Sequence, residues 1–207
     1  MSTEISAGPA GHTDIRPFDA TLHDGRRVRL RPVTPADRER LLDGFRRMSR
    51  RSRLWRFRRS LRRLTEKEIR FLTEPDYHRH VAWGAVSLDE PGEPGVGVAR
   101  FVRDVEAPEV AECAITVVDG WQGVGLGQLL AETLLSAALV RGVDRLVGTF
   151  TPDNLPARKL AARIGGRSPR LHAGLFEVEI PVSWTGRTRR ASLTGVSRIV
   201  GVPRLGR

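Results

Sequence analysis

The sequence predicts an α/β (α+β) fold whose strands and helices follow the order βααβββαβαβ. One observation is an apolar strand over 111–118, which runs through a glycine-rich turn into an apolar helix over 126–141. A second is a short apolar strand over 145–150, followed by a polar turn and another helix that can end at Gly165. Strand-like and helix-like segments therefore alternate through the second half of the chain.

The first half holds a predicted hairpin and two predicted helices. The Asp-Gly pair at 24–25 separates two strand-like segments, which is typical of a β-hairpin turn. The Thr-Pro pair at 34–35 predicts the start of a helix with an apolar face. Thr65 and Glu68 predict a capping box for a second helix over 65–72. Further strands are predicted at 81–88, 96–105 and 175–182.

Three glycines at alternate positions, 123, 125 and 127, lie immediately before the helix that starts at 126. Glycine lets the backbone approach a ligand closely. The first amides of a helix have no partner within it and suit an anion. The spacing differs from the dinucleotide-binding fingerprint, and the Lys-Ser/Thr pair of a P-loop is missing. The segment therefore predicts a backbone cradle for a phosphate-bearing ligand, although a glycine turn that binds nothing is the alternative.

The turn after the strand at 145–150 supplies a second motif. Asp153 or Asn154 can cap the next helix, and Pro156 is tolerated in its first turn. Leu160 and Ile164, with several alanines, give that helix a narrow apolar stripe.

The two motifs resemble those of the GCN5-related N-acetyltransferase (GNAT) superfamily. Gln122, Gly125 and Gly127 fill its pyrophosphate-loop pattern of Gln or Arg, two residues, Gly, one residue, and Gly or Ala. The resemblance implies the GNAT fold, with a mixed, mostly antiparallel central sheet and helices on both faces, and acetyl-CoA as acyl donor. It also implies that the sheet splays beside the strand at 111–118. The donor would then be held by Val117, Val118, Gln122, Gly123, Val124, Gly125, Leu126, Gly127, Asn154 and Arg158.

The segments 48–57 and 72–82 resemble the acetyltransferase domain of bacterial Pat-type protein lysine acetyltransferases. This resemblance extends over about 22–184, and it implies direct acetyl transfer to lysine side chains of a protein substrate. Acetylation of a small amine or a protein α-amine stays open. So does a module of another class, which binds CoA or nucleic acid without catalysis.

Glu112 is the one charged side chain inside the apolar strand that leads into the glycine loop. An ammonium group must lose a proton before its nitrogen attacks a thioester, and a carboxylate can accept that proton. Strand alternation places Glu112, Ala114, Thr116 and Val118 on one face. We expect partial burial to raise the pKa of this carboxyl, and the Pat resemblance places the catalytic Glu at this position. A Glu at an exposed sheet edge, or one paired with an arginine, is the alternative.

Other side chains are expected to play smaller parts. Cys113 lies in the apolar strand and is expected to pack as a small hydrophobe, not to act as a nucleophile. Tyr77, the only tyrosine, is far in sequence from the second motif, so no tyrosine is available there as general acid. His78 and His80 have no acidic partner spaced for zinc, and no metal is predicted. Ten arginines over 46–63 predict a solvated helix face, with a groove for an acidic protein or nucleic acid as alternatives.

Length and composition fit one enzyme domain with tails. The 207 residues carry a formal net charge of +11, part of it in a basic tail over 185–207 that has six arginines and no acidic residue. We expect residues 1–20 to be a disordered N-terminal tail and residues 21–184 to be the acetyltransferase domain. Without a long apolar run or a signal-peptide pattern, the chain is expected to be cytoplasmic. Membrane and nucleic-acid partners are not expected, and the oligomeric state is left open.

Overall fold

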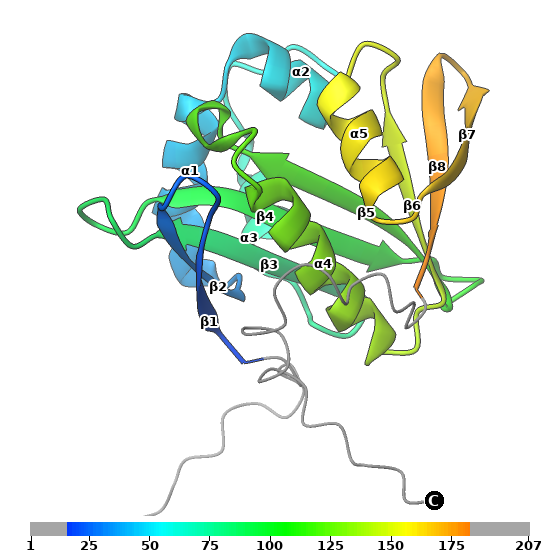
Figure 1. Ribbon diagram of the computed structural model, residues 1–207, viewed down its shortest axis with the longest axis horizontal. Coiled ribbons are helices and arrows are strands. Elements are labelled where there is room, and N and C mark those ends of the chain that lie inside the picture. The colour runs from blue at the N-terminus through cyan, green and yellow to red at the C-terminus, as the bar shows by residue number, and fades with distance from the viewer. Residues whose placement is uncertain (1–15, 183–207) are drawn as a thin grey trace, which may run out of the picture.

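Residues 16–182 are described by a computed structural model, in which eight strands form one sheet with helices on both faces (Figure 1). The strands are β1 (Phe18–Thr21), β2 (Arg27–Pro32), β3 (His80–Ser87), β4 (Gly95–Arg103), β5 (Val110–Val117), β6 (Arg145–Phe150), β7 (Arg167–His172) and β8 (Leu175–Pro181). The α-helices are α1 (Arg38–Arg47), α2 (Arg50–Phe57), α3 (Glu66–Thr73), α4 (Leu126–Leu139) and α5 (Leu155–Arg163). Two short 3-10 helices, η1 (Pro35–Asp37) and η2 (Asp119–Trp121), precede α1 and the glycine loop.

The strands are arranged in the order β1-β2-β3-β4-β5-β6-β8-β7. Neighbouring strands are antiparallel except β5 and β6, which run parallel. The long helix α4 connects these two strands, as a parallel crossover requires. The mixed, mostly antiparallel sheet that the sequence predicted is therefore confirmed.

Helices α4 and α5 cover one face of the sheet, and α1 and α3 pack on the other (Figure 1). The main core lies under α4, where Trp83, Phe101 and Leu126 are fully buried. A smaller apolar cluster beneath α1 and α3 contains Phe45 and Leu72. The two clusters pack on opposite faces of the central strands, and this packing fixes the position of β5.

Most predicted elements are present, and the differences are informative. The hairpin turn at 24–25 and the capping box of Thr65 and Glu68 are both confirmed. The arginine-rich segment predicted as a helix face contains α2, although the predicted order of elements did not count it as a separate helix; Ser49 caps it by accepting from the Ser52 amide at 3.1 Å. Strand β7 was missed.

The N-terminal boundary expected from the sequence is two to three residues late. Strand β1 begins at Phe18 and pairs with β2, so residues 18–20 belong to the sheet and not to the predicted tail 1–20. Residues 1–15, the end of the predicted domain at 184 and the basic tail 185–207 lie outside the described residues. Within the described part, none of the helices is long and apolar enough to cross a membrane.

Candidate active site

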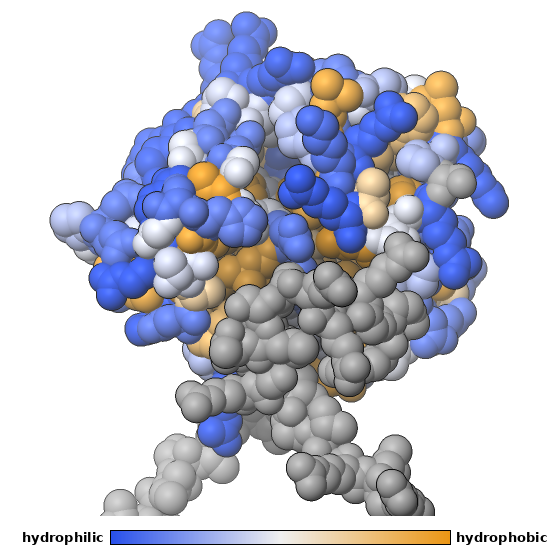
Figure 2. All heavy atoms as spheres, viewed as in Figure 1, coloured by the Kyte–Doolittle hydropathy of each residue, from blue (hydrophilic) through white to orange (hydrophobic). Residues whose placement is uncertain are grey.

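A groove of about 730 Å³ opens where β5 and β6 separate. The parallel ladder between these strands runs from Val110 paired with Arg145 to Cys113 paired with Gly148, and it stops there. Strand β5 continues to Val117 while paired with β4 on its other side. The splay implied by the family resemblance is therefore present. Figure 2 shows hydrophobic surface in the hollowed middle of this face, with hydrophilic residues around it.

The backbone of β5 directs alternate groups into the opening. The Val118 amide donates to the Val96 carbonyl at 3.0 Å, so it belongs to the ladder with β4. Alternate residues of an antiparallel strand point their N–H and C=O groups to opposite sides. Ile115 and Val117 therefore present theirs toward β6, where the ladder has ended. Val118 was expected to help hold the donor, but its amide is not free. The backbone of Ile115, which the sequence analysis did not name, faces the opening instead.

The glycine loop bends back into a helix with an open N-terminus. Gly123 and Gly125 have φ values of 78° and 96°, which side chains rarely adopt. Gly125 is the N-cap of α4 and supplies no side chain to the first amides, and its carbonyl accepts from the Leu129 amide at 3.1 Å. The amides of 126–128 therefore have no partner within the helix, and the anion that the sequence places there stays a prediction.

The N-terminal hairpin supports this loop. The His23 amide donates to the Val124 carbonyl at 3.2 Å, and a Cβ built on Gly125 would lie 3.1 Å from Cε1 of the His23 ring. The Arg26 guanidinium lies 4.0 Å from the centre of the Trp121 ring. The loop is therefore fixed by a hairpin about a hundred residues away in sequence, a contact with no signal in the motif itself.

The ten residues expected to hold the donor occupy different places. Those that line the groove are Val117, Gln122, Gly123, Gly125, Gly127 and Asn154, whereas Val118, Val124, Leu126 and Arg158 do not line it. Gln122 acts within the loop, because its Nε2 donates to the Val117 carbonyl at 3.1 Å. Leu126 is buried in the core, so only its backbone is available. Arg158 is exposed on α5, and the cations of that helix that line the groove are Lys159 and Arg163.

Asn154 caps α5, as the sequence predicted. Its Oδ1 accepts from the Ala157 amide at 3.1 Å. The same residue lines the groove, so the cap and a donor contact are compatible. Its contact with a donor stays a prediction.

Glu112 lies on the predicted face but in a different environment. It shares that face with Ala114, Thr116 and Val118, and it lines the groove. Its side chain is exposed, so the partial burial expected from the sequence is not present. Within the described residues no ion pair to Glu112 is formed, although Arg56 is close enough to feel its charge. Glu112 is exposed but does not lie at a sheet edge, because β5 pairs with β4 and β6 at this residue. It also forms no ion pair with an arginine of the described residues, so neither alternative fits.

Two other candidate groups are excluded from chemistry by burial. Cys113 packs against the core, and burial together with the neighbouring Glu112 carboxylate raises the pKa of its thiol to about 12. Tyr77 is buried, donates to the Val33 carbonyl at 2.6 Å and has a pKa raised by burial. Neither side chain supplies a nucleophile or an acid at neutral pH.

His80 does not belong to the groove. It is buried and stacks on Phe71 with ring centres 4.6 Å apart. Burial and the nearby Arg100 lower the pKa of His80 to about 4, so the ring is neutral. Among the described residues no group of three or more His, Cys, Asp and Glu side chains is placed to hold a metal ion. The absence of a metal stays a prediction.

The arginine-rich segment forms a wall of the groove. Asp119 of the glycine loop accepts from the Ser49 amide at 2.9 Å and from the Ser52 hydroxyl at 3.0 Å. Burial would raise the pKa of Asp119, but these hydrogen bonds hold it below the usual value. At the other end of α2, the Trp55 indole donates to Asp153 at 3.0 Å. Helix α2 therefore joins the two donor motifs, and the prediction of a merely solvated face was wrong.

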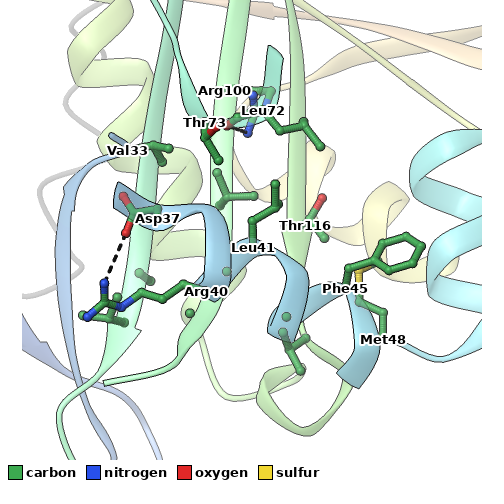
Figure 3. A pocket seen from close by; sticks show the side chains of 18 of the residues that line it. Val33, Asp37, Arg40, Leu41, Phe45, Met48, Leu72, Thr73, Arg100 and Thr116 are labelled. Carbon is green, nitrogen blue, oxygen red and sulfur yellow. Dashed lines mark hydrogen bonds and ion pairs between the residues drawn. The ribbon is translucent and has the colours of Figure 1, made fainter. Parts of the chain in front are cut away.

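A smaller cavity of about 100 Å³ lies between the sheet and helices α1 and α3 (Figure 3). Met48, Arg56 and Thr116 line both this cavity and the groove, so the two spaces adjoin. The cavity is lined mainly by apolar side chains. Its charged members are Arg31, Asp37, Arg40, Arg56 and Arg100.

Comparison with known proteins agrees with this geometry. The family model for the acetyltransferase (GNAT) domain matches residues 27–167. The chain is 34% identical over 168 residues to acetyltransferase Pat of Mycolicibacterium smegmatis, covering 81% of this chain and 50% of that protein. It is 29% identical over 145 residues to acetyltransferase PA5475 of Pseudomonas aeruginosa, covering 70% and 77%. The chain therefore belongs to the acetyltransferase (GNAT) family, and its class is that of the N-acetyltransferases.

Solved structures support the same assignment. The GNAT domain of S. lividans PAT is 27% identical, with a TM-score of 0.74 over 80% of this chain and 96% of that one. The cAMP-binding acyltransferase of Mycobacterium smegmatis is 33% identical, with a TM-score of 0.56 over 81% of this chain and 48% of that one. The chain spans about half the length of these mycobacterial relatives.

Proposed function

We propose that this protein is an acetyl-CoA-dependent N-acetyltransferase that acts on protein lysine side chains, with Glu112 as general base. The observation that carries the proposal is a single groove that contains the splayed edge of β5, the open N-terminus of α4 and the carboxylate of Glu112. The proposed anion site at the start of α4, the free backbone groups at the end of β5 and the Glu112 carboxylate near the start of β5 then lie in this order along the groove. Enzymes of this family use acetyl-CoA as donor.

The residues present fit such a donor. Backbone amides at the start of α4 suit its diphosphate, and Gly123 and Gly125 keep side chains away from them. The Ile115 and Val117 backbone groups suit the amide-bearing arm, which can pair with a free strand edge. One of their N–H groups can stabilise negative charge that develops on the thioester oxygen. Lys159 and Arg163 add positive charge along the groove wall.

The chemical step needs one proton acceptor and one leaving group. The acceptor ammonium gives a proton to Glu112, directly or through a water molecule, and its nitrogen then attacks the thioester carbon. The new carbon–nitrogen bond forms as the carbon–sulfur bond breaks, and the thiolate leaves with the electron pair. The second proton of the attacking nitrogen passes to this thiolate, directly or through water, which gives the amide and the free thiol. Exposure of Glu112 suits this role, because the acceptor and solvent can both reach the carboxylate.

Relatives and surface together favour a protein acceptor over a small amine. The relatives include proteins named Pat, and the 48–57 and 72–82 segments resemble the Pat-type protein lysine acetyltransferases. The first segment contains α2, which lines the groove, and the second runs from the end of α3 into β3 and lines the adjoining cavity at Leu72 and Thr73. A small-amine acetyltransferase or a non-catalytic CoA-binding module remain the outcomes that would replace this proposal.

The test compares Glu112→Gln with Glu109→Gln, an exposed glutamate just before the same strand whose side chain is not part of the groove. Loss of a general base lowers kcat by ~10²–10⁴-fold. Thiol release with lysine peptides should fall by that factor in Glu112→Gln, while acetyl-CoA affinity measured by calorimetry stays near wild type. Glu109→Gln should be unaffected. If Glu112→Gln kept more than about a third of the wild-type rate, the loss would be far smaller than the ~10²-fold loss expected of a base. Glu112 would then not be the general base.

A further inference from the structure

The cavity beside the groove carries positive charge without matching negative charge. Four arginines and one aspartate line it. Asp37 is used by two of them, since it pairs with Arg31 and lies 3.6 Å from Arg40. Arg56 and Arg100 form no ion pair with any carboxylate of the described residues. Buried cations are rare unless paired, so this pair needs an explanation.

Arg100 is the inner member of the pair. Its side chain is almost fully buried, with 3% exposed. It donates to the Leu72 carbonyl at 3.0 Å, next to the C-terminal end of α3 (Figure 3). It also lies 3.1 Å from Nε2 of His80. Its Nε atom has no hydrogen-bond partner within the described residues. Backbone carbonyls thus hold Arg100 in place, but its net charge faces an apolar cavity.

Arg56 is the outer member, and it borders both spaces. Its guanidinium lies 5.2 Å from the Phe57 ring centre, and it has no hydrogen-bond acceptor within the described part of the chain. Burial and the charge of Arg58 lower the pKa of Arg56, whereas Glu112 acts in the opposite sense. The side chain is therefore close to the proposed base and to a second cation, with its own donors unused.

We propose that Arg56, with the charge of Arg100 behind it, binds a carboxylate of the acceptor, so that the preferred substrate is a lysine flanked by an acidic side chain. A carboxylate matches the fork of guanidinium donors and supplies the missing negative charge. The cavity of about 100 Å³ admits a small side-chain carboxylate, and its apolar walls exclude competing water. The inference rests on the proposed function, because it takes the groove beside Glu112 as the acceptor site.

The wider surface of α2 agrees with an acidic partner. Residues 46–63 contain ten arginines and no acidic residue. Few of these arginines find a carboxylate on the protein itself, and those that do pair with Asp43, Asp153 and Glu68. Of the remaining arginines, Arg56 and Arg58 line the groove, where their charge would attract a substrate segment rich in aspartate or glutamate.

The experiment uses the full chain and pairs of lysine peptides that differ only by Glu or Gln, placed at each of the two positions on either side of the lysine. The readout is kcat/KM for thiol release. Wild type should prefer the acidic member of at least one pair by about tenfold, as a charge-assisted hydrogen bond allows. Arg56→Ala should lose this preference, so that its kcat/KM becomes equal for the acidic and the neutral peptide, and Arg56→Lys should keep part of the preference.

The matched control is Arg50→Ala, which removes the same charge from the exposed start of the same helix and should keep the preference. Equal rates for acidic and neutral peptides in wild type would overturn the inference and leave the proposed function standing. An equal loss of kcat on both peptides in Arg56→Ala would also overturn it, since Arg56 would then act through Glu112. If no peptide were acetylated at all, the proposed function would fail first and this inference with it.

Discussion

The part of the groove that we propose for the donor, the donor half, is built from backbone groups, whereas the part beneath α2 that we propose for the acceptor, the acceptor half, is built from side chains. Around the glycine loop, the groups that face the opening are amides of β5 and α4, and the side chains mostly hold the loop itself. Beneath α2, the groups that face the opening are Arg56, Thr116 and Glu112. Backbone atoms recognise a constant chemical group, and side chains can change from one family member to the next without altering the fold.

The two halves also differ in how they are stabilised. The donor loop depends on positive φ angles, which glycine adopts without strain. The acceptor half depends on hydrogen bonds between distant segments, such as those from Ser49 and Ser52 to Asp119. A change in the donor half should therefore act on acetyl-CoA binding, and a change at the junction should act on stability. The following predictions test that division.

The largest effect is expected from Gly125→Val. The new side chain would need φ near 96° and would meet the His23 ring at 3.1 Å. Backbone strain of about 1–3 kcal/mol, and obstruction of the anion site, should raise the KM for acetyl-CoA about tenfold or more. Gly127→Ala is the matched control, because its Cβ would meet only Leu160 and Val117 atoms at 3.7 and 3.8 Å. If both variants bound acetyl-CoA like wild type, the loop would not be the donor site.

A smaller effect, on stability, is expected from Asp119→Asn. Hydrogen bonds to a charged group contribute about 1.5–3 kcal/mol, so the free energy of unfolding measured with urea should fall by an amount near the lower value. The pKa of Asp119 is lowered in the folded protein, so its contribution is present above the unfolded value of about 3.9. It is lost as the pH falls through the folded value. The difference between variant and wild type should therefore vanish in acid, and a constant difference at all pH values would contradict the assignment.

The smallest effect is expected from Asn154→Ala. Loss of an N-cap costs about 1 kcal/mol, which thermal unfolding can measure. Asn154→Ser keeps a capping oxygen and should restore most of that stability. The KM for acetyl-CoA separates the two roles of this residue. A rise in both variants indicates contact between the amide and the donor, whereas a rise in neither leaves Asn154 as a cap alone.

The sequence predicted the conformation of the glycine loop and its flanking elements well because their residues are contiguous. The glycine spacing, the strand before it and the cap of the next helix are each written within about ten residues, and local backbone rules suffice to interpret them. The same local rules gave the hairpin at 24–25 and the capping box of α3. They also placed Glu112 on the correct face of β5, since alternation along a strand needs no tertiary information.

Tertiary structure alone decided how exposed Glu112 is, which β5 amides are free and what α2 does. The Val118 amide bonds to β4 and the Ile115 amide faces the groove, because the register between β5 and β4 fixes the side that each amide faces. That register cannot be inferred from the local sequence. The charge of Arg56 acts on Glu112 and Arg100, which lie about fifty residues away in the sequence, because the fold brings α2 over the sheet. Local sequence sets the conformation of a segment, but its neighbours are set by the burial of distant apolar surfaces, which is where the acceptor site is formed.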